Sequence, residues 1–255
     1  MIRIFGYIWA VVKALCIILT MLLWLFYYAL TTPILGDSTR RAFALRRHWL
    51  RYIGVPFLNI HIEVKGQPIE GAALYVCNHR SFADPIVLCR YLDAFVIAKA
   101  EVASYPVINW GAKKTGVLYV KRENKDSRNA VREKMVETIK SGHNVLVYPE
   151  GTIGLHRHTL PFKTGTFLEA ADNGLKIVPV AIEYMHDSDL WRHHNFLVQF
   201  VTQFSKWRLN VKLHFGEVLE SADGTWLKDQ SEQWINQELE VMQRDWTKIN
   251  FVEAS

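Results

Sequence analysis

The sequence predicts an α/β domain with a mixed sheet flanked by helices, preceded by an N-terminal membrane-associated helical segment. From about Leu58 onward, short apolar runs typical of strands alternate with longer runs typical of helices, which is the pattern of an α/β fold. Before that point the chain is first strongly apolar and then strongly basic. We therefore expect a membrane-anchoring helical segment at residues 1–54 and a separate folded domain at residues 55–255.

The N-terminal segment is the most unusual by composition. Between Arg3 and Asp37 the only charged residue is Lys13, and the uncharged run 14–33 is about as long as the roughly 20 residues that a spanning helix needs. A cleaved signal peptide is the less favoured alternative, because no small-x-small cleavage site follows the run. The segment is therefore expected in or on a membrane.

A basic helix is expected directly after that run, at residues 37–54. Its apolar residues recur at helical spacing, and five arginines occupy the other faces: Arg40, Arg41, Arg46, Arg47 and Arg51. Such a helix suits an anionic lipid interface. The alternative is a solvated basic face packed on the domain, and the position beside the apolar run favours lipid.

The rest of the chain contains eight strand-like runs, and helices fit between several of them. The best helix is Asp126 to Lys140, with Gly142 placed to end it, and a second is expected at 230–246. The strand-like runs are 58–64, 72–77, 94–99, 116–121, 144–149, 176–184, 196–201 and 210–215.

Composition limits the class of protein. Half of the 255 residues are hydrophobic and 22% are charged, so the chain can bury a full core and disorder is not expected. The net charge of +5 suits an anionic partner, whether nucleic acid, a membrane surface or a phosphorylated substrate, and charge alone does not choose among them. The three cysteines do not read as a disulfide framework, which favours a reducing compartment.

The stretch Cys77 to Leu88 places His79 and Asp84 between a strand and a helix. The strand should end at Asn78, and the helix should start with Asp84 as N-cap and Pro85 in its first turn. A histidine at a strand end can accept a proton near neutrality, while a carboxylate on its other ring nitrogen fixes the tautomer. The alternative is that Asp84 only caps the helix and His79 is an ordinary turn residue, and an isolated pair favours that alternative.

Further polar residues follow at the ends of later strands. Lys121 ends the run 116–121 and Arg122 follows it, and together they could hold a phosphate or carboxylate. The sequence Pro149-Glu150-Gly151-Thr152 puts a carboxylate, a hydroxyl and backbone N–H groups into one compact turn, and the stretches LPFKTG (160–165) and IVPVAI (177–182) follow it. Each of these motifs alone is a weak indication of function, but the motifs together and in this order are a specific one.

These pieces, with Val178-Pro179, resemble the glycerolipid acyltransferase family, whose members include the lysophosphatidic acid acyltransferases. The resemblance covers residues 74–182. It implies an acyltransferase-like fold, with residues 55–255 as the catalytic domain, and transfer of an acyl group from acyl-CoA or acyl carrier protein to a lysolipid hydroxyl without a cofactor. It also implies His79 as general base, Asp84 as its partner, and an acceptor site formed by Arg122, Lys121, Glu150, Gly151 and Thr152.

The chemistry agrees with the resemblance in part. A thioester has a good leaving group, so a base and an oxyanion site suffice without a covalent nucleophile. No G-x-S-x-G elbow is present, and Cys77 lies at a strand end that should bury it. One departure concerns the acceptor, because family members that make phosphatidic acid commonly carry an arginine where this chain has Ile153. Lysophosphatidic acid is the first expectation, and a lyso-amino-acid lipid such as lyso-ornithine lipid is the alternative.

Two readings from other classes remain. A metal-dependent hydrolase would use His79 and Asp84 with histidines from His156, His158, His193 and His194, but no His-x3-His pair or zinc-type cysteine pair is present, and no metal is expected. A non-catalytic basic membrane-binding protein would leave the His79–Asp84 pair unexplained. We expect membrane lipids and no nucleic acid as partners, and a catalytic domain on the cytoplasmic face by the positive-inside rule.

Overall fold

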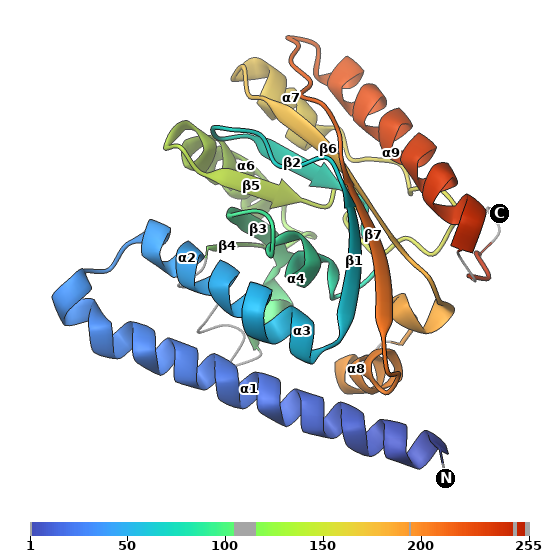
Figure 1. Cartoon of the computed structure of the whole chain (residues 1–255). Coiled ribbons are helices and arrows are strands. Elements are labelled where there is room, and N and C mark those ends of the chain that lie inside the picture. Colours follow the sequence, from blue (N-terminus) through green and yellow to red (C-terminus); the bar gives the residue numbers. More distant parts are fainter. Residues whose placement is uncertain (1, 105–115, 194, 247–248, 253–255) are drawn as a thin grey trace.

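A seven-stranded sheet forms the centre of this computed structural model, which describes the whole chain except residues 1, 105–115, 194, 247–248 and 253–255 (Figure 1). Seven of the eight predicted runs form its strands at closely similar bounds. The strands are β1 (Ile60–Lys65), β2 (Leu74–Cys77), β3 (Ala94–Lys99), β4 (Val117–Val120), β5 (Asn144–Val147), β6 (Ile177–Tyr184) and β7 (Leu209–Phe215).

The strand order is β1-β7-β6-β2-β5-β3-β4, and every neighbouring pair is parallel except β6 with β7. The predicted mixed sheet is confirmed. Because β6, β2, β5, β3 and β4 run in the same direction, their carboxyl ends meet at one edge of the sheet. Side chains that follow these strands are therefore brought to the same edge, where open α/β sheets bind ligands.

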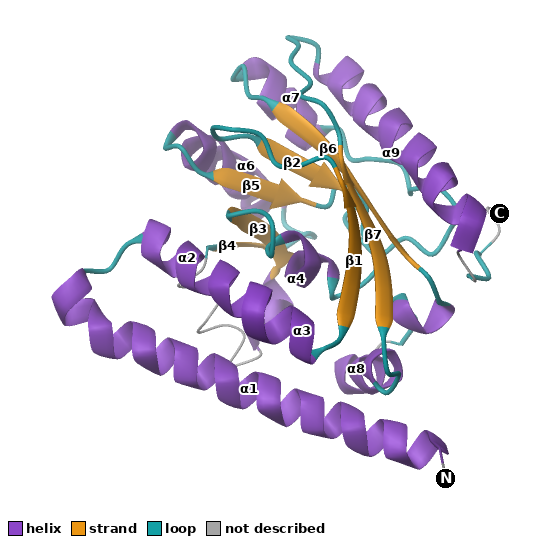
Figure 2. Ribbon diagram, in the orientation of Figure 1, coloured by secondary structure: helices purple, strands orange, loops and turns teal. Residues whose placement is uncertain are grey.

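Helices enclose the strands on both sides (Figure 2). Successive residues of β2 point into two different cores, Tyr75 and Cys77 into one and Leu74 and Val76 into the other. The helices that cover the sheet and extend from it are α1 (Ile2–Leu35), α2 (Thr39–Trp49), α3 (Val55–Phe57), α4 (Asp84–Leu88), α6 (Lys125–Lys140), α7 (Gly165–Asp172), α8 (Phe196–Phe204) and α9 (Gly224–Trp246).

The helix predicted at 126–140 is confirmed as α6. Asn124 caps its first turn by accepting a 2.8 Å hydrogen bond from the N–H of Ser127. Gly142 ends the helix with a φ of 89°, a left-handed conformation that glycine adopts at little cost. The second predicted helix forms the larger part of α9.

The strand predicted at 196–201 is wrong, because this stretch forms α8. Asn195 caps the helix by accepting hydrogen bonds from two backbone N–H groups. Three phenylalanines spaced four residues apart follow, and the ring of Phe200 contacts those of Phe196 and Phe204. A short apolar run does not by itself distinguish a strand from a helix. Here the spacing of Phe196, Phe200 and Phe204 follows the helical period.

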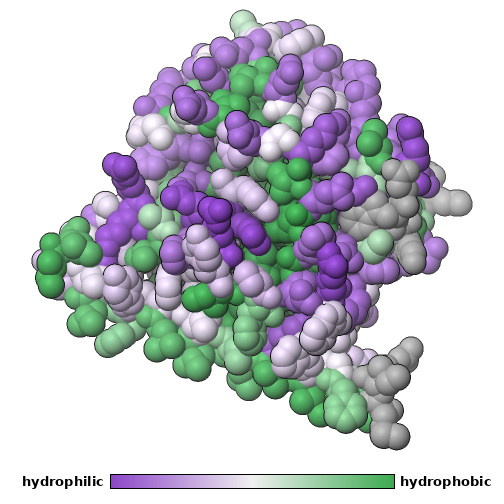
Figure 3. All heavy atoms as spheres, viewed as in Figure 1, coloured by the Kyte–Doolittle hydropathy of each residue, from purple (hydrophilic) through white to green (hydrophobic). Residues whose placement is uncertain are grey.

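Helix α1 lies alongside α2 and α8 (Figure 1). It is long and apolar enough to cross a membrane, and hydrophobic atoms gather along its outer edge (Figure 3). Its one lysine, Lys13, is only 1% exposed and donates hydrogen bonds of 3.3 and 3.2 Å to the backbone carbonyls of Phe204 and Lys206. The charged group thus fastens α1 to the carboxyl end of α8, while most of the other side of α1 stays uncovered.

Candidate active site

His79 leaves the sheet directly after β2. The side chain of Asn78 bonds both the N–H and the carbonyl of Ile182 at 2.9 Å, which extends the pairing of β2 with β6 by one residue. The next backbone group then points elsewhere, because the N–H of His79 donates to Oε1 of Glu150 at 2.7 Å. The carbonyl of His79 accepts from the N–H of Gly154 at 2.8 Å. The histidine is therefore held through its backbone on both sides.

The structure brings His79 and Asp84 together. Nδ1 of His79 lies 2.7 Å from Oδ2 of Asp84, whose side chain is fully buried, whereas that of His79 is 16% exposed. An ionised carboxylate can only accept, so Nδ1 carries the proton and Nε2 presents its lone pair. This is the arrangement of a general base and the group that orients it.

The N-cap role predicted for Asp84 is wrong. Asp84 is the first residue of α4, its N-cap position is Ala83, and the carboxylate accepts instead from residues before the helix, the N–H of Arg80 (2.7 Å) and the N–H of Ser81 (3.0 Å). The following residue, Pro85, has no N–H to offer. The carboxylate therefore organises the turn that carries His79, and the reading of Asp84 as a mere helix cap is excluded.

Two tyrosines that sequence reasoning did not single out complete the surroundings of this pair. The hydroxyl of Tyr184, at the end of β6, donates to Oδ1 of Asp84 at 2.6 Å. The ring of Tyr148, just after β5, stacks on the His79 ring with centroids 4.2 Å apart. Burial and the nearby Asp84 charge raise the pKa of both phenols well above 10.0, so both stay protonated. The two tyrosines reach the His79–Asp84 pair because β5 and β6 are the neighbours of β2 in the sheet.

Glu150 supports the histidine. Its carboxylate is buried, with one oxygen accepting from the N–H of His79 and the other from the N–H of Leu160 at 2.8 Å. Burial raises the pKa of Glu150, and these two N–H groups act in the opposite direction. Both oxygens therefore face backbone donors, and the carboxylate ties the 150–160 loop to His79. Direct contact between Glu150 and the acceptor stays a prediction.

Gly151 and Thr152 form the turn next to that carboxylate. Gly151 has a φ of 70°, and its N–H donates to the carbonyl of Tyr148 at 3.0 Å. Thr152 is exposed on the surface of the turn. The predicted compact turn is present, one strand position from His79, because β5 is the neighbour of β2.

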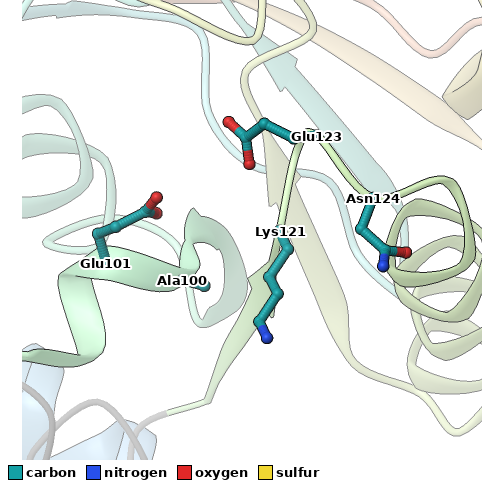
Figure 4. A pocket seen from close by; sticks show the side chains of 5 residues that line it. All are labelled: Ala100, Glu101, Lys121, Glu123 and Asn124. Atoms are coloured by element: carbon teal, nitrogen blue, oxygen red, sulfur yellow. The ribbon is translucent and has the colours of Figure 1, made fainter.

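Lys121 and Arg122 lie farther along the same edge. Strand β4 is three positions from β2, so the two strand ends are roughly 14 Å apart at an ordinary spacing of about 4.8 Å. Lys121 lines an open hollow of about 520 Å³ with Ala100, Glu101, Glu123 and Asn124, and it extends away from the Glu123 carboxylate (Figure 4). Burial lowers the pKa of Arg122, while Glu101 and Glu123 oppose that shift. The two cations are thus separate from the His79 pair and close to carboxylates.

A buried arginine, Arg80, locks the neighbouring loop. It is 1% exposed, pairs with Glu183 at 3.0 Å, and donates to the carbonyls of Gly154, His156 and Arg157. Gln243 of α9 donates to the same Glu183 carboxylate at 2.8 Å. The residue next to His79 thus connects β2, β6 and α9. The sequence signal for it was weak, since a lone arginine is usually solvated.

The histidines of the metal-hydrolase alternative do not converge on His79. Nδ1 of His156 lies 2.9 Å from the carbonyl of Val252, and Nε2 of His158 pairs with Glu240. His193 is exposed, and His194 lies outside the described residues. Among the residues that the structure describes, no three side chains of His, Cys, Asp or Glu gather as metal ligands.

Cys77 is fully buried before the motif. Burial, with the charges of Asp84 and Glu150, raises the pKa of its thiol well above 9.0. A thiol is a nucleophile only as the thiolate. Cys77 is therefore a core residue and not a nucleophile.

Comparisons with known proteins find acyltransferases. Residues 60–183 match the Acyltransferase family model. The chain is 32% identical over 154 residues to a lyso-ornithine lipid O-acyltransferase of Pseudomonas aeruginosa, covering 60% of this chain and 58% of that protein. It is 27% identical over 190 residues to a 1-acyl-sn-glycerol-3-phosphate acyltransferase of Neisseria gonorrhoeae, covering 70% and 74%.

A solved structure confirms the fold. The crystal structure of the 1-acyl-sn-glycerophosphate (LPA) acyltransferase PlsC from Thermotoga maritima is similar with a TM-score of 0.66 and 18% identity, covering 90% of this chain and 98% of that chain. The chain spans about half the length of the curated relatives it matches first.

Proposed function

We propose that this chain, whose residues 60–183 match the Acyltransferase family model, transfers a fatty acyl group from a thioester to the free hydroxyl of a lysolipid. The observation that carries the proposal is the His79–Asp84 pair, in which Nδ1 of His79 lies 2.7 Å from Oδ2 of Asp84 and the histidine side chain is partly exposed. The reaction needs one base close to a hydroxyl, and this pair supplies it.

The proposed reaction runs in two steps. Nε2 of His79 takes the proton of the acceptor hydroxyl as the oxygen attacks the thioester carbonyl, which forms a tetrahedral oxyanion. The intermediate then collapses, the carbon–sulfur bond breaks, and the imidazolium returns its proton to the leaving thiolate. Asp84 stabilises the imidazolium by its charge, and the donors from Arg80, Ser81 and Tyr184 hold the carboxylate in place. The proposed reaction uses no metal or further cofactor, and acyl-CoA or acyl carrier protein enters it as a substrate.

Lysophosphatidic acid is the first-choice acceptor, giving phosphatidic acid. Relatives named for 1-acyl-sn-glycerol 3-phosphate support it. A lyso-amino-acid lipid such as lyso-ornithine lipid is the second candidate, because other relatives are named for that acceptor and Ile153 stands where a phosphate-binding arginine is common.

Residues 1–54 are proposed to anchor residues 55–255 to a membrane. The exposed apolar side of α1 supports this, as do the arginines of α2 beside it. Excess positive charge next to an apolar helix is typical of the cytoplasmic side. We therefore place the catalytic domain on the cytoplasmic face, within reach of lysolipid acceptors in the bilayer.

An acceptor screen tests the function. Purified full-length protein is given one labelled acyl group, as acyl-CoA or as acyl carrier protein, together with lysophosphatidic acid, lyso-ornithine lipid or lysophosphatidylcholine. We expect transfer to at least one of the first two acceptors, and its absence in His79→Ala. Thioester hydrolysis without acceptor dependence, or membrane binding without thioester consumption, would contradict the proposal, and the latter result would favour a non-catalytic membrane-binding protein.

A further inference from the structure

Lys163 lies over the turn that follows β5. Its backbone N–H donates to the carbonyl of Pro149 at 3.0 Å, which fixes the residue beside the turn. Its side chain occupies the space that a Cβ of Gly151 would need, since such an atom would lie 2.4 Å from Nζ and 2.9 Å from Cε. The ammonium group of Lys163 can occupy this space only because residue 151 is a glycine without a Cβ. The contact is between the segment LPFKTG and the turn PEGT, two pieces that are 12 residues apart at Gly151 and Lys163.

The same turn offers backbone donors. Gly151 adopts a left-handed φ of 70°, and turns of this kind often form concave sites where successive N–H groups face an anion. In the described part of the chain, the N–H groups of Thr152 and Ile153 have no hydrogen-bond acceptor, whereas those of Gly151 and Gly154 on either side do. Two unbonded donors therefore lie next to an ammonium group.

A second cation lies at the same segment. The guanidinium of Arg132, on α6, occupies the space of a Cβ at Gly165, 2.7 Å from Nη1, two residues beyond Lys163. The guanidinium of Arg132 donates a hydrogen bond to the neutral side-chain oxygen of Asn129. Within the described part of the chain neither cation pairs with a carboxylate, whereas Lys134 of α6 pairs with Glu137. Two neighbouring cations without an acidic partner attract an anionic ligand.

The position suits the acceptor better than Arg122 does. Glu150 and Gly154, on either side of Gly151, both bond the backbone of His79. In lysophosphatidic acid the phosphate and the free hydroxyl are separated by a short glycerol unit, so they lie within about 5 Å of each other by ordinary bond lengths. Arg122 follows a strand whose end is roughly 14 Å from that of β2.

We propose that the ammonium of Lys163 and the N–H groups of Thr152 and Ile153 bind the anionic headgroup of the lysolipid acceptor. Lys163 thereby supplies the charge that Ile153 does not, and Arg132 adds to the positive potential from the side of α6. The inference rests on the proposed function. The chemistry recognised is an oxyanion, either the phosphate of lysophosphatidic acid or the carboxylate of a lyso-amino-acid lipid, and the experiment distinguishes these sources.

The kinetic test compares three variants of the full-length enzyme on both acceptors. We expect Lys163→Ala to raise the KM of the preferred anionic acceptor about 10-fold or more with kcat changed less than threefold, and Lys163→Arg to restore most of the loss. The matched control is Lys134→Ala, which removes an exposed α6 lysine and should behave as wild type. The acceptor with the larger change in KM identifies the headgroup. Equal KM in Lys163→Ala and wild type overturns the inference and leaves the acyltransferase assignment intact.

A second test does not depend on turnover. Lys163 is exposed and its amine should react with an acylating reagent, with the extent at each lysine measured by mass spectrometry. Lysophosphatidic acid or lyso-ornithine lipid should protect Lys163 several-fold, while the uncharged monoacylglycerol and the control position Lys134 show no protection. If the lipids protect Lys163 but the protein transfers no acyl group, the proposed acyltransferase function is refuted and the anion site at Lys163 is still supported. Absence of protection by both lysophosphatidic acid and lyso-ornithine lipid refutes the site.

Discussion

The hydroxyl of Tyr184 donates a 2.6 Å hydrogen bond to Asp84, 100 residues earlier in the chain. It uses Oδ1, so that Oδ2 remains for Nδ1 of His79 at 2.7 Å. Both Tyr184 and Asp84 are fully buried. A buried carboxylate oxygen without a donor is costly, so the tyrosine stabilises the charged form of Asp84 and fixes the orientation on which His79 depends.

Tyr184→Phe should impair catalysis through this orientation. Loss of the donor leaves Oδ1 buried and unbonded, which should cost about 1–3 kcal/mol of the free energy of unfolding and lower kcat roughly 3- to 30-fold with little change in KM. Denaturant unfolding and steady-state kinetics measure both. Tyr75→Phe is the matched control, because Tyr75 is equally buried and its hydroxyl accepts a hydrogen bond from the N–H of Ile69, away from His79 and Asp84 as far as the described residues show. A similar fall in kcat for both variants would contradict the role of Tyr184.

His79→Ala should lower turnover by about 10² to 10⁴, the usual contribution of a general base. The fold should persist, because the bonds from His79 to Glu150 and Gly154 use its backbone and survive the substitution. Circular dichroism and acyl-transfer assays on the same preparation separate the two effects. His61→Ala, on the exposed side of edge strand β1, is the control and should keep wild-type activity. Wild-type turnover in His79→Ala would show that His79 is not the general base.

Arg122→Ala tests the acceptor-binding role that the family resemblance implies. From its place three strands away, beside Glu101 and Glu123, we expect a rise in the acceptor KM of less than about threefold, clearly smaller than for Lys163→Ala. Side-by-side KM values for both variants on lysophosphatidic acid provide the comparison. If Arg122→Ala raises KM as much as Lys163→Ala or more, Arg122 belongs to the headgroup site.

Stability should fall at alkaline pH. Burial raises the pKa of Cys77 above its usual 9.0 and that of Tyr148 and Tyr184 above 10.0, so on raising the pH the unfolded chain loses these protons first. The stabilisation is fully present below about pH 9 and is lost above it, by about 1.4 kcal/mol per pH unit for each group between its two pKa values. Thermal unfolding at pH 7, 9 and 10 measures the loss.

Cys77→Ala isolates one of these groups. The cavity that it creates should lower stability equally at every pH, and the value at pH 7 gives that cost. The decline between pH 9 and 10 should then be shallower than in wild type, because one titrating group is gone. An unchanged decline would show that Cys77 ionises alike in the folded and unfolded chain.

Membrane binding should depend on the uncovered side of α1. Leu19 and Leu23 are 57% and 56% exposed, so changing both to glutamate should leave the fold intact and reduce binding to anionic vesicles about 10-fold or more. Residual binding through the arginines of α2 should weaken with added salt. Vesicle flotation measures this, with Leu168→Glu on the exposed side of α7 as the control. Full, salt-resistant binding of the double variant would place the anchor elsewhere.

Local patterns in the sequence were enough for most elements and for the central pair. Strand runs such as 94–99 and the helix at 126–140 follow from periodicity and capping, which act over a few residues. His79 and Asp84 share one turn, and their catalytic pairing was predicted only together with the motifs at later strand ends, because an isolated pair at this spacing favours a helix cap. The strand prediction at 196–201 is wrong because a run of five apolar residues and one glutamine fits either period, and the burial of Gln199 and Gln203 on one helical side is known only from the folded chain.

Tertiary structure decided which distant residues reach His79. Because β2 lies between β5 and β6, Glu150, Tyr148 and Tyr184 arrive from neighbouring strand ends, while the strand order puts Arg122 three positions away. The order of residues in the sequence does not predict which of them lie close to His79, since Arg122 is nearer to His79 along the chain than Tyr184 is. Lys163 meets Gly151 only because the loop after β5 folds back on its own start. Strand pairing over long sequence separations depends on the packing of the whole core, and a local pattern does not contain it.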